Sequence, residues 1–168
     1  CGIEDTQMAP GNPAYPFDLA GERIQAAVAA GRALDRPFVL TARADGVMNG
    51  AYDLAEGLRR LQAFEAAGAE CLYLPVPPGR AELAQILASV GKPVNALLAG
   101  PLRTLPMSEL AQIGVRRLSL GSQMARVTHA AIHDVMTGVL GGDFAGLRAA
   151  ARGDVIDALL EKGANPDG

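Results

Sequence analysis

The sequence predicts an α/β fold, a parallel (β/α)8 TIM-type barrel of which this chain forms the C-terminal part, about the fourth to the eighth strand. Short apolar runs alternate with amphipathic helical segments, as expected when helices cover a parallel sheet. Gly68 and Gly114 each end a helix directly before a strand, which is a common connection in such folds. The chain has 168 residues, whereas a complete barrel takes about 250.

The expected elements follow one another regularly, beginning with the end of a strand at residues 1–5. A helix that Asp18 could cap precedes an apolar run at 37–42, which predicts a buried strand. Asp53 could cap the next helix, which Gly68 ends. The later strands are expected at 71–74, 93–98 and 115–120, and the later helices at 82–90, 108–114 and 122–139.

The domain organisation expected from this order has two parts. Residues 1–142 would form the C-terminal part of the barrel. Residues 143–168 would form a C-terminal tail with helices around 144–151 and 155–161, where the apolar pattern is weaker.

Composition excludes several other classes of protein. Hydrophobic residues make up 49% of the chain and charged residues 20%, which favours a sizeable core over disorder. A net charge of −3 and a pI near 5.3 give no reason to expect nucleic acid or an anionic membrane as a partner. No apolar run approaches the ~20 residues of a membrane span and nothing resembles a signal peptide, so we expect a cytoplasmic protein. Cys1 and Cys71 are too few for a disulfide framework, and Cys71, inside an expected strand, is predicted to be structural.

The candidate site lies at the carboxyl ends of the strands, where parallel barrels place their active sites. Glu4 and Asp5 are adjacent and so point to opposite faces; the one inside the barrel could hold a divalent cation or its water shell. Arg43 directly follows a buried strand, where its charge requires an acid or an anionic ligand. Asp45 would share the face of Arg43 and could orient it. A purely structural ion pair is the alternative.

Three further features have both a functional and a structural interpretation. Asn95 ends a strand and could bind a carboxylate or carbonyl of a substrate, or could satisfy the backbone of a turn. Gly121 and Ser122 precede a helix and could bind an anion such as phosphate, but Ser122 could equally be an ordinary N-cap. His129 and His133 have the spacing of some zinc sites, but Ala stands where such a site needs glutamate, so a metal is not expected there.

Four segments carry a more specific signal: Gly-Ile-Glu-Asp at 2–5, Phe-Val-Leu-Thr-Ala-Arg-Ala-Asp at 38–45, Leu-Gln-Ala-Phe-Glu-Ala-Ala-Gly-Ala-Glu-Cys-Leu-Tyr at 61–73 and Lys-Pro-Val-Asn at 92–95. In this order they resemble the isocitrate lyase/phosphoenolpyruvate mutase superfamily, and most of all its phosphoenolpyruvate mutase-like branch. The resemblance implies a barrel enzyme that uses Mg²⁺ to make or break a C–C or P–C bond next to an α-keto acid, through an enolate-like intermediate. It also implies a homo-oligomer, a dimer or tetramer, whose subunits exchange their last helix.

Carried over to this chain, the resemblance implies specific roles. Glu4 would hold water ligands of Mg²⁺, Arg43 would contact the α-keto acid, Asp45 would be the catalytic acid position that follows it, and Asn95 would bind substrate. The substrate would be a small α-keto or 2-hydroxy carboxylic acid. The superfamily's direct metal-binding aspartates would precede residue 1, so we expect the isolated chain to be inactive.

One segment departs from the superfamily's lyases. Those enzymes carry a Lys-Lys-Cys-Gly-His loop soon after the Glu-Asp strand, whereas residues 6–15 contain neither cysteine nor lysine, so chemistry that needs that thiol is not expected. Two alternatives stay open at this point: a phosphate-binding barrel aldolase or isomerase, and a non-catalytic half-barrel.

Overall fold

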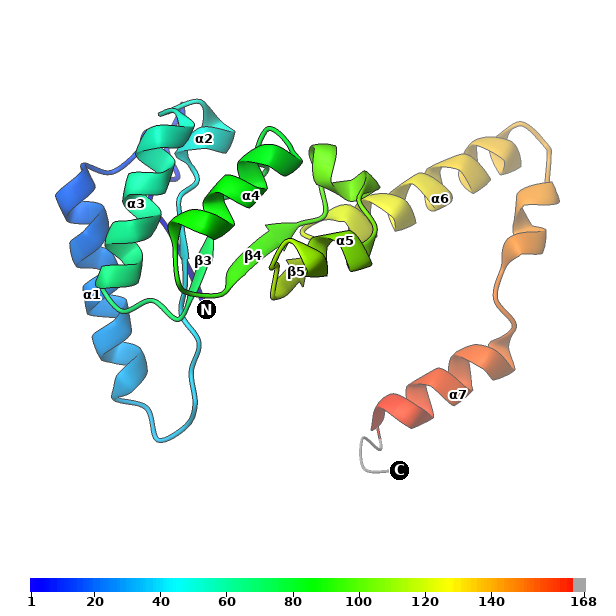
Figure 1. Ribbon diagram of the computed structural model, residues 1–168. Helices are drawn as coiled ribbons and strands as arrows, with labels where there is room; N and C mark the ends of the chain where they lie inside the picture. Colours follow the sequence, from blue (N-terminus) through cyan, green and yellow to red (C-terminus); the bar gives the residue numbers. More distant parts are fainter. Residues whose placement is uncertain (165–168) are drawn as a thin grey trace. The chain divides into compact units, whose positions relative to one another are not determined.

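The computed structural model describes residues 1–164, which include a five-stranded sheet whose neighbouring strands are all parallel. The strand order is the chain order, β1-β2-β3-β4-β5. A doubly wound fold reverses its strand order at a switch point, whereas a barrel adds each new strand on the same side. The predicted parallel, barrel-type α/β architecture is therefore confirmed (Figure 1).

Strands and helices alternate as the sequence predicts, with two short additions, α2 and η1. From the first strand to the last, the elements along the chain are β1 (Gly2–Glu4), α1 (Phe17–Arg32), β2 (Thr41–Arg43), α2 (Gly46–Asn49), α3 (Leu54–Ala66), β3 (Cys71–Tyr73), α4 (Arg80–Ser89), β4 (Val94–Leu97), the 3-10 helix η1 (Gly100–Thr104), α5 (Met107–Gln112) and β5 (Arg117–Ser119). They are followed by α6 (Gln123–Leu140), the 3-10 helix η2 (Ala145–Ala149) and α7 (Gly153–Ala164).

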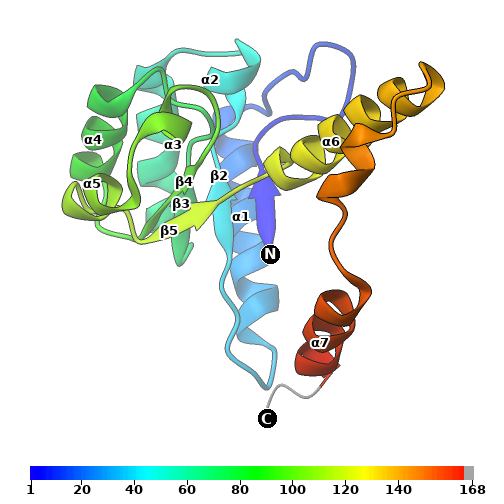
Figure 2. The same cartoon turned by 90° about the vertical axis from the view of Figure 1, so that its right-hand side faces the viewer.

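The core lies between one face of the sheet and the helices that follow its strands (Figure 2). Leu61 and Phe64 of α3 are completely buried against the central residues Ala42 of β2 and Leu72 of β3. A second cluster, which includes Ala96 of β4, packs α4 and α5 on the same face. Because side chains alternate along a strand, the neighbours of these core residues point to the opposite face, which we call the inner face.

The two predicted helix caps have different outcomes. α1 begins at Phe17 with Pro16 as its N-cap residue, so the predicted cap at Asp18 is wrong. Asp18 lies in the first turn instead, where the partial positive charge of the helix end favours an acid. Asp53 caps α3 as predicted, since its side chain accepts a hydrogen bond from the backbone N–H of Glu56 at 2.9 Å.

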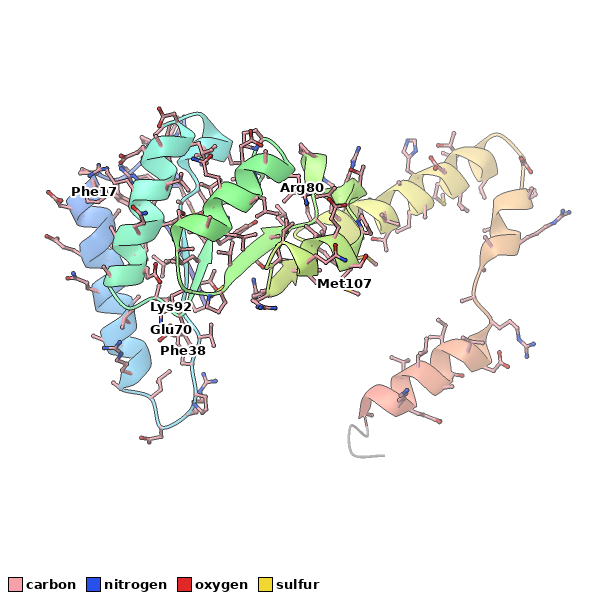
Figure 3. All side chains as sticks on the ribbon, in the orientation of Figure 1. Phe17, Phe38, Glu70, Arg80, Lys92 and Met107 are labelled. Carbon is pink, nitrogen blue, oxygen red and sulfur yellow. The ribbon has the colours of Figure 1, made fainter. Side chains whose placement is uncertain are left out.

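The second strand begins later than its apolar run suggests. β2 covers Thr41–Arg43 rather than 37–42, and Val39 is 57% exposed. The backbone N–H of Leu40 donates to the side chain of Glu70 at 2.9 Å instead of joining the sheet (Glu70 is labelled in Figure 3). An apolar pattern cannot reveal this competition, because the acceptor is 30 residues away in the sequence.

The chain divides into two compact units, residues 1–121 and residues 122–168. The first unit contains the whole sheet. In the second, α6 contacts η2, and no residue described between 122 and 164 is buried. The division predicted after residue 142 stays a prediction. Across residues 1–164, none of the helices has both the length and the apolar character needed to cross a membrane.

The position of the core predicts which leucine the fold requires. Leu61→Ala should lower the free energy of unfolding by about 2–5 kcal/mol, because Leu61 is completely buried and its truncation leaves a cavity. Leu34→Ala is the matched control, since Leu34 is 43% exposed, and it should cost less than about 1 kcal/mol. Urea denaturation followed by circular dichroism measures both; equal losses would contradict this description of the core.

Candidate functional site

One row of residues crosses the whole sheet on its inner face. The register pairs Glu4 with Arg43 and Arg43 with Tyr73. It continues from Tyr73 to Asn95 and from Asn95 to Arg117. Partners in register point to the same face, so each of the five strands contributes one polar or charged side chain to this row.

Arg43 is held from two sides. Its Nε and Nη2 donate to the two carboxylate oxygens of Asp45 at 3.1 and 2.8 Å, so the expected orientation of Arg43 by Asp45 is observed. Its Nη1 lies 2.8 Å from Oε1 of Glu4. A guanidinium has five N–H donors, so these contacts leave two for a ligand. The guanidinium carbon also lies 5.1 Å from the centre of the Tyr73 ring.

Asp5 lies behind this pair, on the helix side of the sheet. The sequence predicts opposite faces for Glu4 and Asp5, and this prediction is confirmed. Asp5 is 2% exposed and accepts hydrogen bonds from the backbone N–H of Asp45 at 2.8 Å, the hydroxyl of Tyr52 at 2.6 Å and Nη1 of Arg60 at 3.0 Å. Asp5 therefore fixes the backbone of Asp45, the residue that in turn holds Arg43.

The backbone at Gly46 leaves the space that Tyr52 occupies. A Cβ at Gly46 would lie 2.0 Å from a carbon of the Tyr52 ring, which is closer than atoms approach. Burial, and then the hydrogen bond to Asp5, raise the pKa of Tyr52, so its hydroxyl keeps the proton that it donates. Glycine at 46 thus permits the contact between Tyr52 and Asp5.

Carboxylates outnumber guanidinium groups around Arg43. Burial raises the pKa of Asp45 above its usual value; Arg43 opposes this shift, and the charges of Glu4 and Asp5 add to it. Burial also raises the pKa of Tyr73, which keeps that hydroxyl protonated on the inner face. On the inner face two carboxylates, those of Glu4 and Asp45, thus share the one guanidinium of Arg43, while Asp5 is paired with Arg60.

The opposite end of the row has a different composition. Nη1 of Arg117 donates to Oδ1 of Asn95 at 2.7 Å, and Nδ2 of Asn95 donates to the hydroxyl of Ser119 at 2.9 Å. A cavity of about 440 Å³ opens over the row, and its lining includes Arg43, Tyr73, Asn95, Arg117 and Ser119. A cavity of this size accommodates a small organic acid.

Sequence reasoning found Glu4, Arg43, Asp45 and Asn95, and the structure brings all four to the carboxyl end of the sheet. It missed Arg117. Two arginines are adjacent at 116 and 117, and the partial burial of Leu118 against the core, together with the pairing of Arg117 with Asn95, shows that Arg117 faces inward. The sequence did carry a signal: Leu118 is the apolar residue of Arg-Arg-Leu-Ser, so it is expected on the core side, and alternation then places Arg117 on the opposite face.

The other candidates do not join the row. Cys71 is 3% exposed, as expected for a structural thiol. His129 and His133 are exposed on α6, where His133 contacts Asp134. Ser122 is the N-cap residue of α6 without a side-chain cap hydrogen bond. Gly121 lines the cavity, and an anion site at its backbone stays a prediction.

The fit of these residues to Mg²⁺ is partial. Within residues 1–164, no group of three or more His, Cys, Asp or Glu side chains is arranged to hold a metal ion. Glu4 could still contribute to a metal site, because its carboxylate is 40% exposed on the inner face, next to Arg43. It can therefore accept hydrogen bonds from water on a cation, but it cannot form a ligand set alone.

The fold and the row define a class of protein, a (β/α) barrel-type α/β fold with a polar site at the carboxyl ends of its strands. The family model for phosphoenolpyruvate phosphomutase matches residues 1–140, and the chain belongs to this family. The resemblance to the phosphoenolpyruvate mutase/isocitrate lyase superfamily is thereby confirmed.

The relatives are enzymes. An oxaloacetate decarboxylase from Paraburkholderia xenovorans (strain LB400) is 36% identical over 147 residues, which cover 83% of this chain and 47% of the relative. A candidate lyase/mutase from Burkholderia cenocepacia J2315 has a TM-score of 0.86 and 38% identity over 95% of this chain and 58% of its own. A phosphonopyruvate hydrolase solved with oxalate and Mg²⁺ shares the fold, with a TM-score of 0.76 and 22% identity over 99% of this chain and 60% of its own. The chain thus spans about half the length of the curated relative.

The buried contacts of Asp5 predict a large effect of a small change. Asp5→Asn should lower the free energy of unfolding by about 3–5 kcal/mol, because it leaves the buried guanidinium of Arg60 without its full partner. Asp53→Asn is the matched control: asparagine caps a helix as well as aspartate does, so stability should change by less than about 0.5 kcal/mol. Chemical denaturation of both variants decides the matter, and a neutral Asp5→Asn would show that the cluster is not structural.

Proposed function

We propose that the whole protein is a Mg²⁺-dependent enzyme that makes or breaks a C–C or P–C bond next to the carbonyl of a small α-keto acid. The proposal rests on Arg43, whose guanidinium contacts Asp45 on one side and Glu4 on the other at the carboxyl end of the sheet. Two of its N–H donors remain for a ligand, and the guanidinium lines a cavity. The 36% identical oxaloacetate decarboxylase supports a carbon–carbon bond as the one broken, whereas membership of the phosphoenolpyruvate phosphomutase family is compatible with either bond.

Arg43 has the geometry to bind the carboxylate and the keto oxygen of such a substrate. Asp45 and Glu4 fix the guanidinium before the ligand arrives, so little orientation is lost on binding. When a bond beside the carbonyl breaks, its electron pair is held as an enolate, and negative charge collects on the oxygen. A fixed guanidinium stabilises that charge without reorganising. Asn95 retains one N–H of its amide for the substrate, and the protonated hydroxyl of Tyr73 offers another donor.

The excess of carboxylates around Arg43 supports a divalent cation at this end of the row. Mg²⁺, when bound, would polarise the keto oxygen. Glu4 would hold the cation through water, since its carboxylate is partly exposed and already contacts Arg43. The phosphonopyruvate hydrolase that shares this fold contains both oxalate and Mg²⁺, which is consistent with such an arrangement.

The exposed apolar side chains of the second unit support the proposal of a homo-oligomer with helix exchange. Met124, Val127, Ile132, Met136 and Leu140 of α6 are each at least 48% exposed. Exposed apolar side chains of this kind are favourable only when another surface covers them, either the part of the relatives' length that this chain does not span or a second copy, and we propose the second copy. Analytical ultracentrifugation should give a dimer or tetramer, and Ile132→Glu with Met136→Glu should shift it toward monomer; a monomeric wild type would contradict the proposal.

Arg43→Lys should reduce turnover of oxaloacetate, and the affinity for oxalate, by about 100-fold or more. A lysine ammonium is a point charge that cannot bind Asp45 through two parallel hydrogen bonds and a ligand at the same time. Arg80→Lys is the control, because Arg80 forms an exposed ion pair with Glu109 between the outer helices (Arg80 is labelled in Figure 3). It should change both quantities less than threefold, roughly the range of a surface substitution. Unchanged turnover in Arg43→Lys would refute the role of Arg43.

Glu4→Gln should weaken Mg²⁺ binding by about 10–100-fold, the usual effect of changing a residue that holds a metal's water ligands. The substitution keeps the size of the side chain but removes its charge. Isothermal titration calorimetry with Mg²⁺ alone measures the effect, and Glu22→Gln, at an exposed position of α1, is the control. Equal Mg²⁺ affinity in Glu4→Gln and the wild type would contradict the water-mediated role.

A further inference from the structure

The segment from Asp45 to Tyr52 is closed at both ends by one buried carboxylate, that of Asp5. At its start the backbone N–H of Asp45 donates to Oδ1 of Asp5 at 2.8 Å, and at its end the hydroxyl of Tyr52 donates to Oδ2 at 2.6 Å. Between these contacts lie the short helix α2 and Met48, which lines the cavity. Asp5 therefore joins the two ends of a segment that borders the site.

The two carboxylate oxygens of Asp5 have different partners. Oδ2 accepts hydrogen bonds from the hydroxyl of Tyr52 and from Nη1 of Arg60, whereas Oδ1 accepts the backbone N–H of Asp45. An aspartate carboxylate turns readily about its last side-chain bond, because that torsion has a broad energy profile. The two donors on Oδ2 remove this freedom, so Oδ1 stays directed at the N–H of Asp45.

Arg60 is itself held on several sides. Its Nε donates to Glu56, one turn earlier in α3, at 2.8 Å, and its Nη2 donates to the backbone carbonyl of Tyr15 at 3.0 Å. Its guanidinium carbon lies 4.7 Å from the centre of the Tyr52 ring. Because the side chain is only 6% exposed, water competes little for these hydrogen bonds.

A continuous series of hydrogen bonds joins this cluster to the inner face. Asp5 fixes the backbone of Asp45, and the carboxylate of Asp45 accepts two hydrogen bonds from Arg43 at 3.1 and 2.8 Å. Asp45 is the N-cap residue of α2, but its side chain makes no cap hydrogen bond and turns to Arg43 instead. A displacement of the Asp45 backbone would therefore displace the guanidinium of Arg43.

We propose that Tyr52 and Arg60 are positioning residues, which set the orientation of Arg43 through Asp5 and Asp45 from the helix side of the sheet. The functional part of this inference rests on the proposed function, in which Arg43 binds the α-keto acid. Catalysis by a fixed guanidinium is sensitive to its placement, since an error of about 1 Å can cost about 100-fold in rate. A purely structural role predicts lower stability but unchanged properties of the folded protein.

Tyr52→Phe removes one hydroxyl and keeps the ring beside Gly46. In the whole protein with Mg²⁺, the affinity for oxalate and kcat/KM for oxaloacetate should each fall about 10-fold, less than a 1 Å error would cost. Tyr15→Phe is the matched control, because Tyr15 contacts Arg23 with its ring and Arg60 with its backbone, and it should change both quantities less than about threefold. Melting temperatures close to that of the wild type would show that the variants are folded.

Arg60→Lys keeps a positive charge beside Asp5 but cannot contact Asp5, Glu56 and Tyr15 at once. It should lower both quantities at least as much as Tyr52→Phe does. Arg59→Lys is its control, because Arg59 contacts the same Glu56 from a position that is 54% exposed. If Arg60→Lys does not fold, Tyr52→Phe decides the proposal alone.

Combination with Arg43→Lys separates positioning from a general loss of structure. If Tyr52 acts through Arg43, Tyr52→Phe should lower kcat/KM by less than about twofold once residue 43 is lysine, because no guanidinium is left to orient. An effect that is independent of Arg43 would be equally large in both backgrounds, and that result would overturn the proposal.

The orientation of Arg43 can also be measured without substrate. Its Nε–H donates to Asp45, and in a ¹⁵N NMR spectrum it is the guanidinium signal that Arg43→Lys removes. Tyr52→Phe should make this Nε–H exchange with water at least about 10-fold faster, because local opening of the contact becomes easier. Tyr15→Phe should leave the exchange rate unchanged.

The outcomes distinguish the two proposals. Oxalate affinity, kcat/KM and Nε–H exchange that are the same in Tyr52→Phe as in the wild type overturn the positioning role and leave the proposed function intact. If oxalate binding does not depend on Arg43, the proposed function fails, whereas faster exchange of the Arg43 Nε–H in Tyr52→Phe would still support the positioning role.

Discussion

The site depends on one buried carboxylate, that of Asp5. It accepts the backbone N–H of Asp45 on one side and the side chains of Tyr52 and Arg60 on the other. Through Asp45 this contact fixes the guanidinium of Arg43, so an interaction on the helix side of the sheet sets the geometry of a group on its inner face. A loop residue that must hold an arginine in one place needs such an anchor, because loops are otherwise the more mobile part of a fold.

Parallel pairing accounts for the rest of the arrangement. Strands in parallel register bring their carboxyl ends to one edge, and alternation then separates each strand into core residues and inner-face residues. Ala42, Leu72 and Ala96 pack against the helices, while Arg43, Tyr73 and Asn95, each adjacent to one of them, line the cavity. The same backbone geometry therefore determines both the stability of the unit and the position of its chemistry.

The sequence predicted those features that depend on neighbours in the chain. The Arg43–Asp45 contact follows from a spacing of two residues, and the opposite directions of Glu4 and Asp5 follow from adjacency in a strand. Features that join distant residues were not predictable in the same way. Asp5 and Arg60 are 55 residues apart, and Leu40 and Glu70 are 30 residues apart, so neither contact leaves a local pattern. Arg117 was missed because its direction depends on where β5 begins.

The close approach of Gly46 to Tyr52 means that the residue at position 52 limits which amino acids position 46 can accept during evolution. Any side chain at 46 would occupy the space of the Tyr52 ring, where a Cβ would come within 2.0 Å of it. A chain that gained a side chain at 46 would have to lose the aromatic ring at 52, and with it the hydroxyl that contacts Asp5. The dependence runs in one direction: position 52 can become smaller while glycine stays at 46, but a side chain at 46 is accommodated only when the ring at 52 has moved or been lost.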